Sequence, residues 1–415
     1  MRYLLIFFLL FFTVALPVSA ADRELGLAKV MLEDAILRDD AEGMRLARER
    51  LIPIAAEATD RNEQRDAHYL VALSAFFESL SAYRDAAAAG RIAMTGIRYA
   101  DRAIEIDPQF ADAWMISSAL RRSAARAGQP VAPDPSRFMK AVELDPKSPL
   151  VAFSNGLVKA MNPLGPANPE GVQIIDDLAA RLDADRAATG RPFGLWDAEA
   201  HAMKIMVRFA ADDPRADAMR ALAASLVKQR PDFVLGNWVA ESVVEKHFVS
   251  APAVTWQPFL TDAVGDGKSA TNPDVVAVDR AESGDRLWYR ITFHDALPKS
   301  FGTNIVVNRS GDPATGMKWW GVGSTARFDR LVTAWITRDG DRYFGRVGVT
   351  DDDGARGQRF SKITSDVQLA MDGDRTVMVG VPKNALGVND KSTFVVAGGT
   401  HLVWNDDATN VVNSR

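Results

Sequence analysis

Two acidic clusters in the C-terminal part of the chain carry residue types that could do chemistry. Asp351 and Asp353 stand in one Asp-rich segment, and Asp406 and Asp407 follow Asn405 near the end of the sequence. Hydrolysis of a glycosidic bond needs two carboxyl groups flanking that bond, one of them in an apolar pocket that raises its pKa. Both clusters are predicted to lie in turns, where such a pocket is not expected. They therefore argue against a glycosidase.

Calcium binding is a better use for these acids, because a hard cation takes several carboxylate and carbonyl oxygens that converge from loops. None of the groups has the spacing of an EF-hand loop. The alternative interpretation is that they are solvated turn residues. Three groups could supply the oxygens: Asp351 and Asp353 with the carbonyls around Gly354; Asn405, Asp406 and Asp407; and Asp262, Asp266 and Asp274.

Other catalytic patterns are missing from the sequence. The five histidines are not paired at the spacing of a zinc site, and no G-x-S-x-G segment or phosphate-binding glycine loop occurs. We therefore expect a protein that is not an enzyme.

Tryptophans in the C-terminal part could instead bind a ligand. Trp319 and Trp320 are adjacent, so on a strand their side chains would point to opposite faces, and one of them is expected to leave the core. Trp404 stands at the end of a predicted strand beside Asn405. Exposed indole rings near Asp and Asn are suited to stacking on a sugar, which makes these four residues candidate ligand-binding residues. Packing at a sheet edge or against the helical domain would use the same rings.

The chain from 21 to 250 reads as a series of helices. Apolar residues recur at spacings of three and four, which gives each segment one apolar face, and prolines and glycines are expected between the helices. Two segments, 100–114 and 138–153, nearly repeat. Each has alanine five positions before a proline, and the two prolines, Pro108 and Pro146, are 38 residues apart.

This repeated segment resembles the tetratricopeptide repeat, a helix-turn-helix unit of 34 residues that stacks into a solenoid. Trp114 and Phe138 stand where that pattern has its aromatic residues, and the resemblance extends over about 64–238. It implies a solenoid whose concave side holds a protein or peptide.

From residue 260 to 415 the pattern alternates between apolar and polar residues, with acidic turns between the runs. Its acids are 19 Asp and one Glu, and Asp favours turns. Alternation with frequent turns predicts antiparallel strands and a β-sandwich, and residues 251–259, with two prolines, are the predicted junction. Strands are expected at 286–293, 303–307, 328–336, 343–349, 375–381 and 392–396, and turns at 282–285, 310–312, 339–341 and 351–354.

The order of segments from DVVAVD through GDRLWYRITFHD and FDRLVTAWITRDGDRYFGRVGVTDDDG to HLVWNDD, at about 274–407, resembles family-9 carbohydrate-binding modules and their DOMON-type relatives. The resemblance implies a β-sandwich that often carries calcium and sometimes holds a sugar between tryptophans. A different β-sandwich is the alternative.

Residues 1–20 have the pattern of an export signal: an apolar run from Leu4 to Leu16, then Val18 and Ala20 at the −3 and −1 positions. The apolar run is short for a membrane-spanning helix. The chain has no cysteine, which excludes a lipoprotein anchor and a disulfide framework. We expect a periplasmic or secreted protein.

Charge and composition narrow the class of partner. The formal charge is −5, with 47% apolar residues, so a folded core is expected and a basic patch for nucleic acid is not. The sequence therefore predicts a multidomain α + β protein, with a helical solenoid followed by an antiparallel β-sandwich. Its expected role is to hold a protein or peptide in the cell envelope. The alternatives are glycan binding by the sandwich and, with less support, glycoside hydrolysis.

Overall fold

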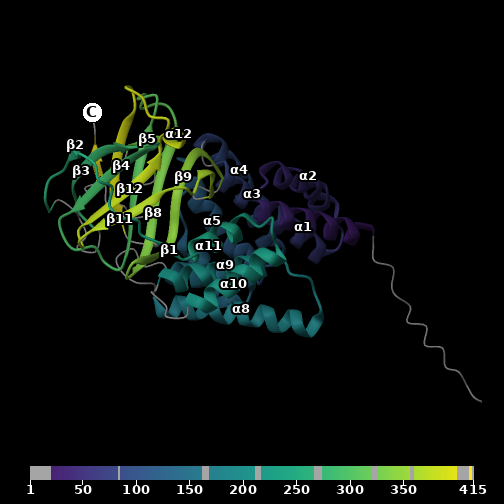
Figure 1. Ribbon diagram of the computed structural model, residues 1–415. Helices are drawn as coiled ribbons and strands as arrows, with labels where there is room; N and C mark the ends of the chain where they lie inside the picture. Colours follow the sequence, from purple (N-terminus) through teal and green to yellow (C-terminus); the bar gives the residue numbers. More distant parts are fainter. Residues whose placement is uncertain are drawn as a thin grey trace, which may run out of the picture.

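The computed structural model describes residues 20–82, 85–160, 168–210, 216–265, 273–319, 325–355, 359–399 and 411–413. Helices fill the N-terminal part of this range and antiparallel sheets fill the C-terminal part, as the sequence predicts (Figure 1). Residues 1–19, which hold most of the predicted export signal, lie outside the described range.

The helical domain consists of five hairpins and one further helix. Each helix contacts the next along the chain, which is the arrangement that the predicted solenoid requires. The helices are α1 (Ala20–Arg38), α2 (Ala41–Glu57), α3 (Arg61–Ser81), α4 (Ala86–Ile106), α5 (Ala111–Arg126), α6 (Pro135–Leu144), α7 (Pro149–Ala160), α8 (Pro169–Thr189), α9 (Leu195–Ala210), α10 (Ala216–Gln229) and α11 (Val234–Ser242).

The odd-numbered helices form the inner layer. Contacts run from α1 to α3, from α3 to α5, from α5 to α7, from α7 to α9 and from α9 to α11. Helix α1 also contacts α9 and α11, and Arg230 forms an ion pair with Asp34 at 2.8 Å across the closure. The array therefore curves back on itself, and its first and last hairpins meet.

Local sequence explains where many helices begin. Asp40, Asp60, Asp85 and Asp134 each stand before a helix, and their carboxylates accept hydrogen bonds from backbone N–H groups of its first turn. Helix α8 ends at Gly190, whose φ of 68° is a left-handed conformation that glycine adopts without strain.

Prolines and glycines are expected between helices, but one proline and one glycine lie inside helices. Pro53 lies inside α2, and Gly90 lies inside α4. A Cβ on Gly90 would stand 2.4 Å from the amide nitrogen of Gln129, so glycine here allows a close approach. Pro53 stands near the end of a helix that packing holds along its length.

The C-terminal strands form two main sheets and one short ribbon. One sheet has the order β1-β9-β8-β5-β13-β14 with β10 on β9, the second has the order β11-β12-β4-β3-β2, and β6 pairs with β7. The strands are β1 (Lys246–His247), β2 (Gln257–Thr261), β3 (Val275–Ser283), β4 (Arg286–Phe293), β5 (Ser300–Asn308), β6 (Met317–Lys318), β7 (Arg327–Phe328), β8 (Arg330–Asp339), β9 (Arg342–Ala355), β10 (Arg359–Thr364), β11 (Gln368–Asp372), β12 (Thr376–Pro382), β13 (Thr393–Gly399) and β14 (Val411–Asn413), with the short helix α12 (Lys383–Leu386) after β12.

A shared apolar core joins the two main sheets. Tyr289 and Ile291 of β4 pack in the same cluster as Ile305 of β5 and Val349 of β9. All six predicted strands are present. The turn predicted at 351–354 is wrong, because β9 continues to Ala355 and pairs there with β10.

The helical domain and the sandwich contact each other through β9. Phe344 belongs to the apolar core of the helical domain, and the Arg220 guanidinium stacks on its ring at 5.4 Å. Arg346 stacks on Trp238 of α11 at 4.9 Å, and burial lowers the pKa of this arginine to about 10. The sandwich is thus anchored on the helices by an aromatic side chain.

The predicted junction at 251–259 lies between two sheet segments. Strand β1 precedes it and pairs with β9, while its last three residues belong to β2. The division into separately folding units stays a prediction. Among the described helices, none is both long enough and apolar enough to cross a bilayer.

Replacing Phe344 with alanine should loosen the sandwich from the helices. We expect a loss of about 3–5 kcal/mol of stability, the usual cost of removing a buried phenylalanine, together with new proteolytic cleavage at 250–256. Phe394→Ala, in the sandwich core, is the matched control and should lower stability without that cleavage. Identical digestion patterns for the two variants would show that Phe344 does not couple the domains.

Candidate functional site

The predicted ligand-binding residues are only partly within the described structure. Trp319 is fully buried, so its ring is not available to a ligand. It packs with Val306, Met317, Phe328, Leu331, Val395 and Ala397. Trp320, Trp404 and Asn405 lie outside the described residues.

The predicted calcium ligands are likewise divided. Asp351 is half-buried on β9 and stands opposite Arg330 of β8, and the backbone of Asp353 belongs to the same strand. Asp406 and Asp407 lie outside the described residues. Within the described ranges, no three His, Asp or Glu side chains converge as metal ligands.

A different polar site lies in the helical domain, around Tyr69 of α3. This residue is 8% exposed, and its ring packs edge-on against Phe110 at 5.3 Å between centroids. Among the described residues, none forms a hydrogen bond with the Tyr69 hydroxyl. Burial, and then the charges of Asp112, Glu33 and Asp66, raise the pKa of this phenol well above its usual value. The three carboxylates that act on the pKa of this hydroxyl come from three inner helices, α1, α3 and α5.

Glu33 of α1 has only a distant ion pair within the described residues. Its side chain is 26% exposed and its nearest cation is Lys29 at 3.9 Å, beyond hydrogen-bonding distance. Burial raises the pKa of Glu33 and the charge of Asp197 raises it further, while the charges of Lys29 and Arg191 lower it. A buried acid elsewhere, Glu78, is better matched, because it pairs directly with Arg48.

Asp112 stands in the first turn of α5. Its carboxylate accepts a hydrogen bond from the Ser148 hydroxyl at the start of α7. Burial raises its pKa to about 6, with smaller contributions in the same direction from Asp145 and Asp66. We call Glu33, Asp66, Tyr69 and Asp112 the acidic tract.

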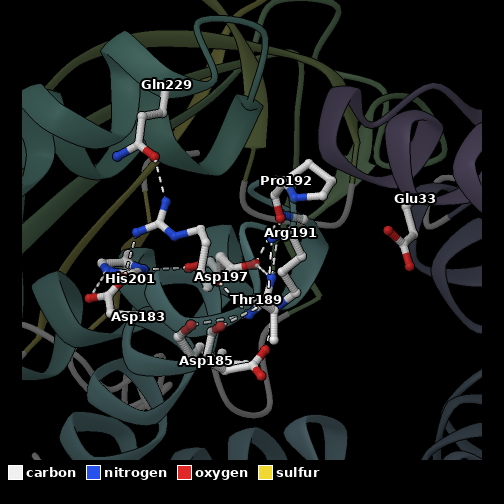
Figure 2. A network of polar contacts seen from close by, with 12 residues as sticks. Glu33, Asp183, Asp185, Thr189, Arg191, Pro192, Asp197, His201 and Gln229 are labelled. Carbon is white, nitrogen blue, oxygen red and sulfur yellow. Dashed lines mark hydrogen bonds and ion pairs between the residues drawn. The ribbon is translucent and has the colours of Figure 1, made fainter. Parts of the chain in front are cut away.

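A second set of residues, which we call the Arg191 network, lies next to the tract (Figure 2). Arg191 donates hydrogen bonds to both oxygens of Asp197, at 2.6 and 3.0 Å, and to Asp185 at 2.5 Å. Asp197 is 1% exposed and also accepts a bond from the Gly194 N–H. The carboxylate of this buried aspartate is therefore fully satisfied.

His201 extends the Arg191 network along α9. Its Nδ1 lies 2.6 Å from the backbone oxygen of Asp197, and its Nε2 lies 3.2 Å from Asp183. Arg186 joins Asp183 to Gln229. The network ties α8 to α9 and to the end of α10 through internal hydrogen bonds.

The tract and the network meet at Gly194. Oxygens of Asp197 and Glu33 lie 3.6 and 3.8 Å from the point where a Cβ on this glycine would stand. Figure 2 shows Glu33 projecting from α1 with no dashed line to the network. The Asp197 carboxylate is hydrogen-bonded to Arg191, whereas the Glu33 carboxylate belongs to the acidic tract.

Sequence reasoning missed the tract because its members are scattered over 80 residues on three helices. No short motif holds them, and an acid on a helix reads as a solvated surface residue. The Arg191 network has a local signal, the string WDAEAH at 196–201, which puts acids and a histidine into an apolar helix.

No protein family and no curated protein matches this chain.

Neutralising Asp112 should stabilise the protein. Its pKa is about 6 in the folded state against 3.8 for the ordinary side chain, so the folded state binds this proton more tightly. The resulting stability is full below pH 3.8 and is lost as the pH rises to 6. Asp112→Asn should therefore gain about 1–3 kcal/mol above pH 6 and almost nothing near pH 4, measured by urea unfolding. Glu105→Gln, on an outer helix, is the control, and an equal gain there would contradict the assignment.

Removing Arg191 should have the opposite effect. Arg191→Met leaves the Asp197 carboxylate buried without its cation, which typically costs about 3–5 kcal/mol. Arg102→Met breaks an exposed ion pair with Glu105 and should change the urea midpoint little. Equal midpoints for both variants would mean that Asp197 finds other compensation.

Proposed function

We propose that the chain is an exported, non-enzymatic binding protein whose helical domain holds a protein or peptide partner. The observation that carries this proposal is the acidic tract on the inner helices. Glu33 and Tyr69 form no hydrogen bonds with other described residues, although Tyr69 is 8% exposed. Neither the Glu33 carboxylate nor the Tyr69 hydroxyl is a fully buried group without a partner, so another molecule can supply one.

Access to the tract supports the proposal. Asp66 is 41% exposed at its side chain and Glu33 is 26% exposed, so both acids reach solvent. Half-buried aromatic residues, Phe110 and Trp114, stand beside it on the same inner layer. Arg65 and Arg137 already stack on these two rings, so the acids and the phenol are the groups that a partner could use.

Glycoside hydrolysis is less well supported. Glu33 and Asp197 both lie beside Gly194, and burial raises the pKa of Glu33 as a general acid requires. Asp197, however, is 1% exposed and both its oxygens bind Arg191. It cannot reach a sugar ring as a nucleophile or activate a water against one.

Glycan binding by the sandwich and calcium binding stay predictions. The first now depends on Trp320 and Trp404, because Trp319 is buried. Export depends on the signal at 1–20, and the periplasmic or secreted location stays a prediction with it.

Site-directed crosslinking tests the proposed function. A photoreactive amino acid in place of Lys29, one turn before Glu33 and 57% exposed, should capture a partner in the cell envelope. The same probe in place of Arg98, an exposed residue of the outer helix α4, is the control. Adding Tyr69→Phe should reduce the Lys29 adduct. The absence of any adduct specific to Lys29 would contradict a partner at the inner helices.

A further inference from the structure

The inner helix α5 carries opposite charges at its two ends. Asp112 stands in its first turn, and Arg122 and Arg126 stand in its last two turns. Both arginines are exposed, and a spacing of four residues puts them on the same side of the helix. Partial burial, and then the charge of Arg126, lower the pKa of Arg122. Each arginine of this pair therefore has a second cation as its neighbour.

These two arginines lack the partners that nearby arginines have. Arg121 and Arg137 both pair with Asp101, at 2.9 and 2.6 Å. Among the described residues, neither Arg122 nor Arg126 forms an ion pair or a side-chain hydrogen bond. A guanidinium has five N–H donors in a fixed fork. The donors of both side chains are therefore available to another molecule.

Helix α7 places a third polar group at this end of α5. The inner helices α5 and α7 contact each other and run in the same direction, because α6 runs back between them. At their N-terminal ends the Ser148 hydroxyl donates to the Asp112 carboxylate. Asn155 lies two turns beyond Ser148, as Ala119 lies two turns beyond Asp112, so these two residues stand at the same level. Arg122 is one turn further along.

The side chain of Asn155 has no partner within the described residues. It is 9% exposed, and its amide forms no hydrogen bond there. Neither polar atom of the amide is completely enclosed, so the group reaches solvent. Buried side-chain amides usually have hydrogen-bond partners. An amide that packing holds in place at the surface can take its partner from another molecule.

Apolar side chains stand beside these polar groups. Val158, one turn after Asn155, is 47% exposed. On the other side of α5, the hydroxyl oxygens of Ser79 and Ser123 lie 3.1 Å apart, so the C-terminal part of α3 lies against the same part of α5. Phe76 in that part of α3 is half-buried. The patch combines two cations, an amide and apolar surface.

This combination selects an extended acidic polypeptide. Guanidinium groups bind carboxylates through paired hydrogen bonds. Side chains one helical turn apart have their Cβ atoms about 5–6 Å apart, and alternate residues of an extended chain point to the same side at a spacing of about 6–7 Å. The amide can both donate to and accept from a peptide group. A small anion would use the cations and leave the amide without a partner.

We propose that Arg122, Arg126 and Asn155 bind an extended segment of a partner polypeptide that carries acidic residues at alternate positions. The two carboxylates bind the arginines, and a peptide group of the segment binds the asparagine amide. This inference rests on the proposed function, because it takes the partner of the helical domain to be a polypeptide. It uses no residue of the acidic tract, so the two sites can be tested separately.

Calorimetric titration of the full chain with the blocked peptide acetyl-Leu-Glu-Ala-Glu-Leu-amide tests the proposal. One matched peptide has glutamine in place of both glutamates, a second has the two glutamates adjacent, and inorganic phosphate is a further arm. We expect the first peptide to bind about tenfold more tightly than the glutamine peptide and about threefold more tightly than the peptide with adjacent acids. The chain has a net charge of −5, so its overall charge does not attract an acidic peptide.

Variants separate the patch from the rest of the surface. Arg122→Gln and Arg126→Gln should each weaken peptide binding about tenfold, and Asn155→Ala about threefold. Arg98→Gln makes the same change in charge on the outer helix α4, and Asn62→Ala removes an exposed amide at the start of α3. Both controls should leave the affinity unchanged. The two arginine variants should keep the wild-type urea midpoint, because neither side chain has a partner to lose within the described residues.

Three outcomes would overturn the assignment. These are equal affinities for the glutamate and glutamine peptides, equal effects of Arg122→Gln and Arg98→Gln, and phosphate binding as tightly as the glutamate peptide. If any of them occurs while the Lys29 crosslink persists, the proposed function stands and the acid-binding patch fails. Loss of both results removes the inner helices as a binding surface.

Discussion

Burial of α3 on every side is the constraint on which the helical domain depends. Nine consecutive residues, from Ala67 to Ala75, are buried, so this helix has no face for solvent. Helices α1, α2, α4 and α5 must surround it, and β9 of the sandwich contacts it as well. An ordinary amphipathic helix needs one neighbour, whereas α3 needs neighbours on all sides. The closure of α1 onto α9 and α11 and the seating of Phe344 complete the enclosure of this core.

The same packing brings acidic side chains to the inner layer of helices. Some of them are paired with a cation and others are not. Asp197 is sealed by Arg191 and the Gly194 N–H, and Glu78 is paired with Arg48. Among the described residues, Glu33 and Asp112 form no short ion pair, and burial raises the pKa of both, as it does that of Glu78. A protein that needed only stability could replace these two acids by neutral residues. Acidic groups that lower the stability of the folded state are a feature that binding sites often share.

The spacing of apolar residues predicts much of this fold, because helices and strands each impose their own spacing along the sequence. Spacings of three and four predict the helices, alternation predicts all six expected strands, and the Pro108 and Pro146 connections fall between helices. Pro53 and the Asp-rich run at 351–354 were predicted to end elements and do not, since neighbouring helices or strands hold their backbone in place. Tertiary packing overrides local preference at such positions. The tract was not predictable, because Glu33, Tyr69 and Asp112 meet only after three hairpins have stacked.

Gly194 lies between Asp197 of the Arg191 network and Glu33 of the acidic tract. Its φ lies outside the left-handed region, and a Cβ would make contacts of 3.6 and 3.8 Å, which are ordinary van der Waals distances. Neither backbone conformation nor steric clash therefore demands glycine. What glycine provides is space between a carboxylate that has all its partners and one that has none within hydrogen-bonding distance. On the Asp197 side, two hydrogen bonds to Arg191 fix the ends of α8 and α9. On the other side of Gly194, the packed helices hold the Glu33 carboxylate in place without giving it a hydrogen-bond donor among the described residues. Such preorganisation of an acceptor favours binding.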